Sequence, residues 1–218
     1  MELLNCNAII TSPALTPVVF SQMFFTKIGV VEEDGFGQGY IFSDQVCQVQ
    51  SPRFHFIAMG GGTMQFTPSP DLPPLEQDDL ILDIVPKIVR ALGQIPFIAL
   101  GINFILREGD TEQFVNERTQ RLFYRKGIAP FTYFTDPDAR FGGYMSKDFH
   151  GFRLKMEIKP ALLQKPKVPP MHSVLFSFNF HKDLDTKDSV GAIEQSLGLW
   201  RVAREHSDEI ARSAFAGG

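Results

Sequence analysis

Two pairs of histidine and aspartate are the residues of this chain whose types and spacing come nearest to acid–base chemistry. Asp148 precedes His150 by two positions, and His181 precedes Asp183 by the same interval. A carboxylate within hydrogen-bond reach can orient an imidazole as a general base. Residues two apart on a strand point the same way, however, so this spacing also arises by chance. Neither pair lies near a nucleophile motif such as GxSxG, and we predict no catalytic residue.

Metal and phosphate motifs are missing from the sequence as well. The five histidines lack the HExxH spacing, and Cys6 and Cys47 are a single, distant pair. The glycine-rich stretches 34–39 and 60–62 are not followed by Lys-Ser/Thr and a helix, which a phosphate-binding loop requires. We therefore expect no metal, no cofactor and two reduced cysteines, with both glycine stretches serving as turns between strands.

A short internal similarity supplies the candidates for ligand binding. Residues 95–111 read IPFIALGINFILREGDT and residues 172–186 read HSVLFSFNFHKDLDT. Aligning Asn103 with Asn179 puts bulky apolar side chains on one face of each strand and small or polar ones on the other. We predict that Asn103, Asn179 and Ser177 bind a ligand in a groove between two related halves. The alternative is that another element packs on these small residues and that the Asn amides bind loop backbone.

The segment 130–144 is dense in aromatic residues for a connection rich in turns. Large aromatic side chains that are exposed together usually mark an interface. The alternative, given equal weight, is that the segment folds back over a sheet edge and covers the core. The interface candidates are Phe131, Tyr133, Phe134, Phe141 and Tyr144.

Strands and turns are expected to dominate the first half of the chain. Residues 18–32 and 39–50 flank the glycine turn and are predicted to pair antiparallel. Residues 53–59 and 63–67 alternate in polarity around three glycines and predict a second hairpin. Apolar residues at helical spacing then predict one helix over 75–92, kinked at Pro86.

Helices and one well-patterned strand are expected in the second half. A helix is predicted from about 111 to 125, with Asp110 as its N-cap. Strict alternation over 152–159 predicts the second strand of a hairpin with one buried face. A single last helix is predicted over about 187–215 from the spacing of its apolar stripe.

The overall composition narrows the classes of protein. A net charge of −4 without a basic block argues against a dedicated nucleic-acid binder. The 21 phenylalanines indicate a generous core, an apolar contact surface, or both. The uncharged stretch from Leu3 to Thr26 is interrupted by Asn, Pro and Gln and follows Glu2 instead of a basic flank. We interpret that stretch as buried strand, turn and buried strand in a cytoplasmic protein that does not engage a membrane.

Two stretches carry a resemblance to a known family. PFIALGINFIL at 96–106, the helix after it and LWRVAREHSDEIARSAF at 199–215 resemble the layout of a sporadically distributed bacterial protein family of unknown function, over roughly residues 45–215. That family tends to carry an Arg-Tyr-Ile-Asn-like sequence on the middle strand, where this chain reads Gly-Ile-Asn-Phe. The resemblance implies a small bacterial cytosolic protein, associated with mobile or defence genes. No activity is established for that family, so the resemblance identifies no catalytic residue in this chain.

Together these patterns predict an α+β protein with antiparallel sheets built from two related halves, 1–126 and 127–218, which form one compact unit and are covered by about three helices. The predicted role is a non-catalytic binding or assembly module that engages itself or a partner protein. The alternatives are a hydrolase or transferase with a cleft between the halves, and a module that senses a small ligand.

Overall fold

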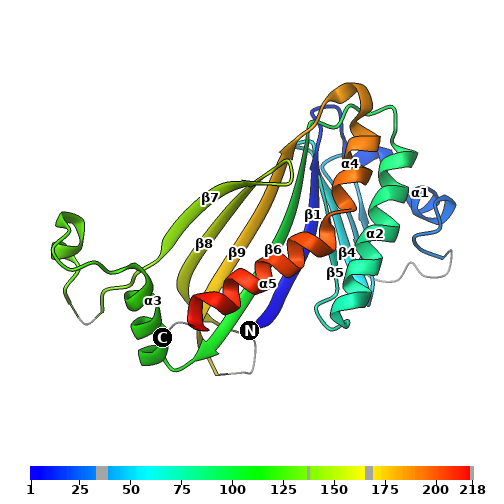
Figure 1. Cartoon of the computed structure of the whole chain (residues 1–218). Coiled ribbons are helices and arrows are strands. Elements are labelled where there is room, and N and C mark those ends of the chain that lie inside the picture. The colour runs from blue at the N-terminus through cyan, green and yellow to red at the C-terminus, as the bar shows by residue number, and fades with distance from the viewer. Residues whose placement is uncertain (33–38, 137, 165–168, 217–218) are drawn as a thin grey trace. The chain divides into compact units, whose positions relative to one another are not determined.

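The computed structural model describes residues 1–32, 39–136, 138–164 and 169–216 and confirms the mixed helix and strand fold (Figure 1). Its described strands form one nine-stranded antiparallel sheet, in the order β2-β3-β4-β5-β1-β6-β9-β8-β7. The strands are β1 (Glu2–Thr11), β2 (Ile41–Phe42), β3 (Val46–Gln50), β4 (Phe54–Met59), β5 (Thr63–Pro68), β6 (Ala99–Asp110), β7 (Gly143–Phe149), β8 (Phe152–Leu163) and β9 (Met171–Asp183).

The helices lie between groups of these strands and after the last one. The α-helices are α1 (Gln22–Lys27), α2 (Pro74–Ala91), α3 (Glu112–Phe123), α4 (Ser189–Leu197) and α5 (Trp200–Ala216). The described residues also form the short 3-10 helices η1 (Pro17–Val19), η3 (Ala129–Tyr133) and η4 (Thr186–Asp188). No helix in the described ranges is long and apolar enough to cross a membrane.

The chain divides into two compact units. Unit 1 contains Met1–Leu4, Phe104–Asn179 and Arg204–Gly218, and unit 2 contains Asn5–Asn103 and Phe180–Ala203. Each unit draws on residues before and after position 126, so this division differs from the predicted one. The two related halves therefore stay a prediction.

The apolar face of the repeat strands is buried as predicted. Leu100, Ile102 and Phe104 on β6 are each 0 % exposed, and Phe176 and Phe178 on β9 are at most 2 % exposed; Phe180 is also buried. Ile98 matches this face in the sequence but is 40 % exposed. It precedes β6, where its N–H donates to the carbonyl of Thr11, so the alternation has not yet begun there.

Helix α2 covers the apolar face of unit 2. Its buried side chains Val85 and Ile88 pack against Ile10, Phe56 and Phe66 from three neighbouring strands, and α4 lies beside α2 (Figure 1). The single helix containing Pro86 is confirmed. The hairpin of β4 and β5 is also confirmed.

Gly62 closes that hairpin in a conformation that requires glycine. Its φ is +76°, and a Cβ placed there would lie 2.3 Å from the carbonyl oxygen of Ser12. The N–H of Ser12 donates to the carbonyl of Gly62 at 2.8 Å, so the turn is held against the end of β1. The glycine run therefore serves a backbone contact as well as a turn.

The predicted strand over residues 18–32 is wrong. That region forms η1 and α1, and the Ser21 hydroxyl caps α1 by accepting the N–H of Phe24 at 3.1 Å. Helical turns let Phe20 and Phe25 both pack against Phe56, with ring centroids 5.0 and 5.2 Å away. Strand β3 pairs instead with β2 and β4, and most of the expected glycine turn lies outside the described residues.

The predicted N-cap of the helix after β6 is wrong by one residue. Thr111 is the N-cap of α3, and its hydroxyl accepts the N–H of Phe114 at 3.3 Å. Thr and Asp are both good caps, so the sequence Asp-Thr does not decide between them. The helix ends at Phe123, two residues earlier than expected.

The predicted single last helix is wrong, because the chain forms two helices there. Asp188 caps α4 by accepting the N–H of Gly191, and α4 ends before Gly198. A new helix begins at Trp200, whose side chain is 0 % exposed and donates its indole N–H to Asp78 of α2 at 2.6 Å. Gly198 allows the break, and burial of the indole explains where α5 begins.

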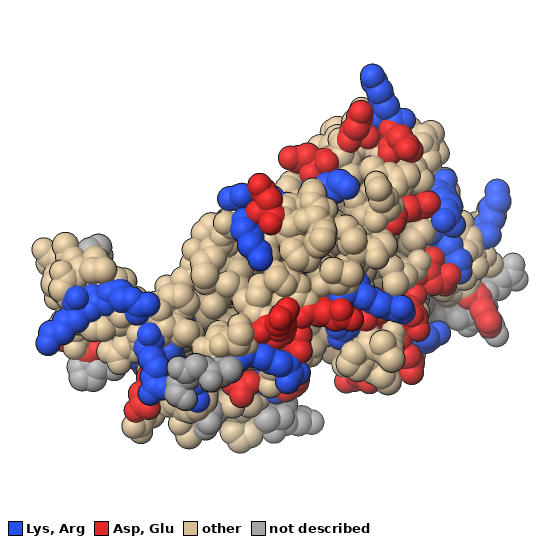
Figure 2. Space-filling model, in the orientation of Figure 1, with Lys and Arg blue, Asp and Glu red and all other residues tan. Residues whose placement is uncertain are grey.

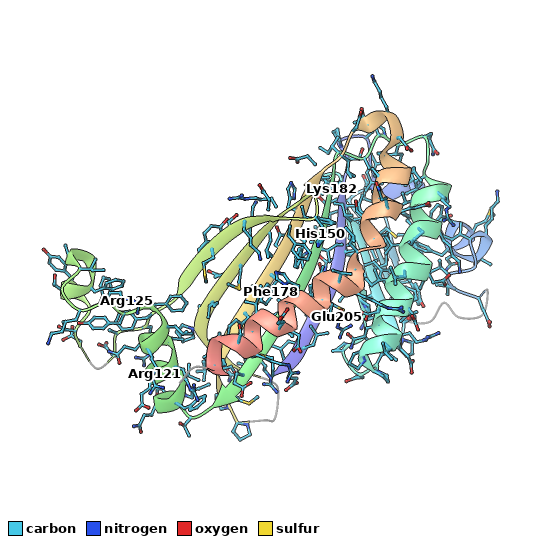
Figure 3. The ribbon with its side chains drawn as sticks, in the orientation of Figure 1. Arg121, Arg125, His150, Phe178, Lys182 and Glu205 are labelled. Carbon is cyan, nitrogen blue, oxygen red and sulfur yellow. The ribbon has the colours of Figure 1, made fainter. Side chains whose placement is uncertain are left out.

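In unit 1, the later part of α5 packs on β9, and Phe178 lies on the apolar face that this helix covers (Figure 3). Phe176 makes an edge contact with Phe215 of α5, with ring centroids 5.4 Å apart. The guanidinium of Arg118 on α3 lies 5.4 Å from the centre of the Phe215 ring. These contacts join the sheet, α3 and α5 within unit 1.

We predict that Phe178→Ala lowers the free energy of unfolding by roughly 3 to 5 kcal/mol, because it removes a buried ring and leaves a cavity. The matched control is Leu162→Ala in the same unit, where the side chain is 56 % exposed. That control should change stability by less than about 0.5 kcal/mol. Urea denaturation measures both, and equal losses would contradict the assigned buried face.

Candidate functional site

A row of uncharged polar side chains crosses the face of unit 2 opposite α2. Gln50 on β3 pairs with His55 on β4, and His55 pairs with Thr67 on β5. Asn7 on β1 and Asn103 on β6 continue the row, since the amide Nδ2 of Asn103 donates to Oδ1 of Asn7 at 2.8 Å. We call these five residues the polar row.

The imidazole of His55 is the chemically distinctive member of the polar row. Its Nε2 is buried, and no described residue forms a hydrogen bond with it. Burial lowers the pKa of His55 from its ordinary value of 6.5, so the ring is neutral at pH 7. A buried, neutral imidazole therefore lies among the uncharged amides and the hydroxyl of this row.

The three predicted ligand-binding residues are divided between the units. Asn103 belongs to unit 2, whereas Ser177 and Asn179 lie half-buried on β9 in unit 1, on the face opposite Phe176 and Phe178. A shared groove therefore stays a prediction. Gln50, His55, Thr67 and Asn7 were not predicted, although alternation along β3, β4 and β5 already placed polar residues on one face.

The two histidine–aspartate pairs differ in geometry. Asp148 accepts a hydrogen bond from Arg153 at 3.1 Å, and His150 occupies the turn after β7 with a φ of +46°, its ring edge-on to Phe149. His181 Nε2 does lie 3.1 Å from Asp183 Oδ1, but that carboxylate is 93 % exposed. His150 and His181 belong to different units.

The aromatic segment is partly buried and partly exposed. Phe141 is 6 % exposed and packs against Tyr124 and Phe131, with ring centroids 5.3 and 6.1 Å away. Tyr133 and Phe134, by contrast, are 83 % and 54 % exposed. Tyr144 at the start of β7 is 65 % exposed. The buried rings thus anchor a segment that displays the others.

Basic side chains gather at the same end of unit 1. Figure 2 shows Lys and Arg side chains around the part that carries α3 and the aromatic segment. Arg121 and Arg125, labelled in Figure 3, and Lys126 are all exposed there. We call Arg121, Arg125, Lys126, Tyr133 and Phe134 the aromatic–basic surface.

A pocket of about 230 Å³ lies between the hairpin β7–β8 and helix α5, entirely within unit 1. Lys147 Nζ on β7 lies 3.0 Å from His206 Nε2 on α5, and the His206 ring stacks on Phe149 with centroids 4.6 Å apart. The pocket is lined by Met145, Ser146, Lys147, Leu154, Met156 and Ile210.

The protonation state of His206 follows from this setting. Burial lowers the pKa of His206 most, the positive charges of Lys147 and His150 lower it further, and Glu209 opposes them. The ring is therefore neutral at pH 7, and its Nε2 accepts a hydrogen bond from the Lys147 ammonium.

Comparisons of the chain with protein-family models, with curated proteins and with solved structures gave no match. The resemblance to a bacterial family of unknown function therefore stays a prediction. Among the described residues, no group of three or more His, Cys, Asp or Glu side chains is placed to hold a metal ion.

We predict that Asn7→Ala and Asn103→Ala each lower the free energy of unfolding by about 1 kcal/mol, and that the double variant loses about 1 kcal/mol less than the sum. The reason is the direct amide contact between them. A double-mutant cycle by urea denaturation measures this coupling. Strict additivity would show that the two amides do not interact.

We also predict that His206 titrates below 6.5 and that Lys147→Met raises its pKa, because one of the repelling charges is removed. Lys155→Met, on the other face of the same hairpin, is the control and should leave it unchanged. The pH dependence of the His206 ring NMR signals measures this pKa in the wild type and in both lysine variants. No movement with Lys147→Met would contradict the contact.

The lowered pKa values of His55 and His206 determine how the free energy of unfolding changes with pH. A folded-state pKa below the unfolded value of 6.5 means that the unfolded chain binds more protons as the pH falls. The stability contributions of His55 and His206 are therefore present above pH 6.5 and are lost as the pH falls from there through their folded-state pKa values.

Proposed function

We propose that this protein is a non-catalytic binding or assembly module, which engages a copy of itself or a partner protein through the aromatic–basic surface. The observation that supports the proposal is the pair of aromatic rings, Tyr133 and Phe134, that are displayed to solvent on a segment anchored by the buried ring of Phe141. Exposed tyrosine and phenylalanine supply contact area with few rotatable bonds.

The anchoring explains how such a surface keeps its form. Phe131 and Phe141 fix the two sides of the segment against Tyr124, which directly follows α3. The Arg140 guanidinium also binds Glu112 in the first turn of α3. A pre-organised surface loses little conformational entropy on binding, which favours affinity.

The charges beside the rings favour an acidic counterpart. Arg121, Arg125 and Lys126 are exposed around the aromatic segment, while the whole chain has a net charge of −4. Positive side chains at the rim of an interface steer association with a negative surface. Another copy of this acidic chain meets that requirement, as does an acidic partner protein.

The wider setting of this function is also a proposal. The lack of a basic block over the whole sequence supports a protein partner in preference to nucleic acid. The resemblance noted in the sequence supports a small bacterial cytosolic protein. The matching of the two strand-and-helix segments supports an origin from two related halves.

Light scattering at tens of micromolar tests self-association. We expect a mass about twice the 24.5 kDa of the chain, falling to that of the monomer in the double variant Tyr133→Ser/Phe134→Ser. The loss follows because both rings leave the interface. Met23→Ser, at a side chain that is 78 % exposed in unit 2, is the matched control and should keep the dimer mass.

If the wild-type chain is monomeric, a partner protein is the remaining form of the proposal. A photo-crosslinking residue at position 134 should then give one discrete adduct in the source cells, and the same residue at position 23 should not. A monomeric protein without that adduct would overturn the proposed function.

A further inference from the structure

The pocket in unit 1 has an apolar interior. Met145 on β7 pairs with Met156 on β8, and Lys147 pairs with Leu154, so these four side chains share the face toward α5. Ile210 of α5 closes the opposite side. Leu154 and Met156 are 2 % and 8 % exposed, whereas Met145 is 42 % exposed and marks the open side.

A single cationic side chain lines this apolar pocket. Lys147 is exposed, and its ammonium donates to the imidazole of His206, which carries no charge at pH 7. The neighbouring carboxylate of Asp148 is directed to Arg153. Glu209 lies on the far side of the imidazole, 3.9 Å from Nδ1 of His206. No Asp or Glu is among the lining residues.

We propose that this pocket binds a free medium-chain carboxylic acid, with the carboxylate on Lys147 and the alkyl chain among Met145, Leu154, Met156 and Ile210. A charge-assisted hydrogen bond from an ammonium to a carboxylate is stronger than one to a neutral acceptor, so the ligand displaces a weaker interaction of Lys147. Methionines adapt to a flexible chain because they have several rotatable bonds.

The volume sets the length of the alkyl chain. A water molecule takes about 30 Å³ in the liquid, and a methylene group is of similar size. A pocket of about 230 Å³ therefore accommodates about eight carbons. The inference rests on this pocket and on Lys147, and it does not depend on the aromatic–basic surface.

Isothermal titration calorimetry of the full chain at pH 7.5 with hexanoate, octanoate and decanoate tests whether the alkyl chain binds in the apolar interior of the pocket. Burying each added methylene should strengthen binding about fourfold until the pocket is full. We expect the gain to stop near eight carbons. A gain that continues unchanged to dodecanoate would indicate non-specific adsorption to exposed apolar surface and would overturn the proposal.

The carboxylate contact is tested with octanol and with two lysine variants. Octanol should bind about tenfold more weakly than octanoate, and Lys147→Met should weaken octanoate binding about tenfold while leaving octanol unchanged. Lys155→Met, on the opposite face of the hairpin, should bind octanoate like the wild type. Equal binding of octanoate to the two lysine variants would overturn the role of Lys147.

A measurement on the unaltered chain keeps the proposal testable if a variant does not fold. Octanoate should shift the methyl NMR signals of Met145 and Met156 in the wild-type protein and leave that of Met23, in unit 2, unmoved. The double variant Tyr133→Ser/Phe134→Ser should bind octanoate as the wild type does. Failure of the proposed aromatic–basic surface can therefore be distinguished from failure of the proposed pocket. No octanoate binding at millimolar concentration would overturn the inference.

Discussion

The long strands β6, β8 and β9 each have one apolar face that must be buried, and much of the rest of the structure follows from that constraint. Side chains alternate along a strand, so Phe176 and Phe178 share a face and require a helix above them. In unit 1 that cover is α5, and in unit 2 it is α2. The same alternation leaves polar side chains such as Asn103 on the other face.

Much of the sheet was predictable, because period-two alternation is a local signal. Residues 152–158 and the hairpin around Gly62 were recognised from it. Helix α1 was not predicted, because a short apolar run rich in Phe is compatible with a helix and with a buried strand. Only the contact with Phe56 in the folded chain favours the helix. The break between α4 and α5 at Gly198 depends on the hydrogen bond from the buried Trp200 indole to Asp78. Asp78 lies 122 residues away in sequence, so no local pattern predicts the break.

The candidate sites were less predictable than the fold. Asn103 was predicted from the repeat, but its partner Asn7 lies on the first strand, 96 residues earlier, and no sequence spacing connects the two. The pocket was missed entirely, since Lys147, Leu154 and Ile210 come from three elements and none belongs to a motif. Sites assembled from single side chains of several elements become visible only when the chain is folded.

The position of Lys147 on β7 has a consequence for pairing between molecules at the edge of the sheet. β7 is the last of the described strands in the sheet, and an edge strand is a template for pairing with the edge of another molecule. An inward-pointing charge on such a strand opposes edge pairing, because a strand added there would have to desolvate the ammonium. We expect Lys147, at the mouth of the pocket, to disfavour pairing at the β7 edge in this way.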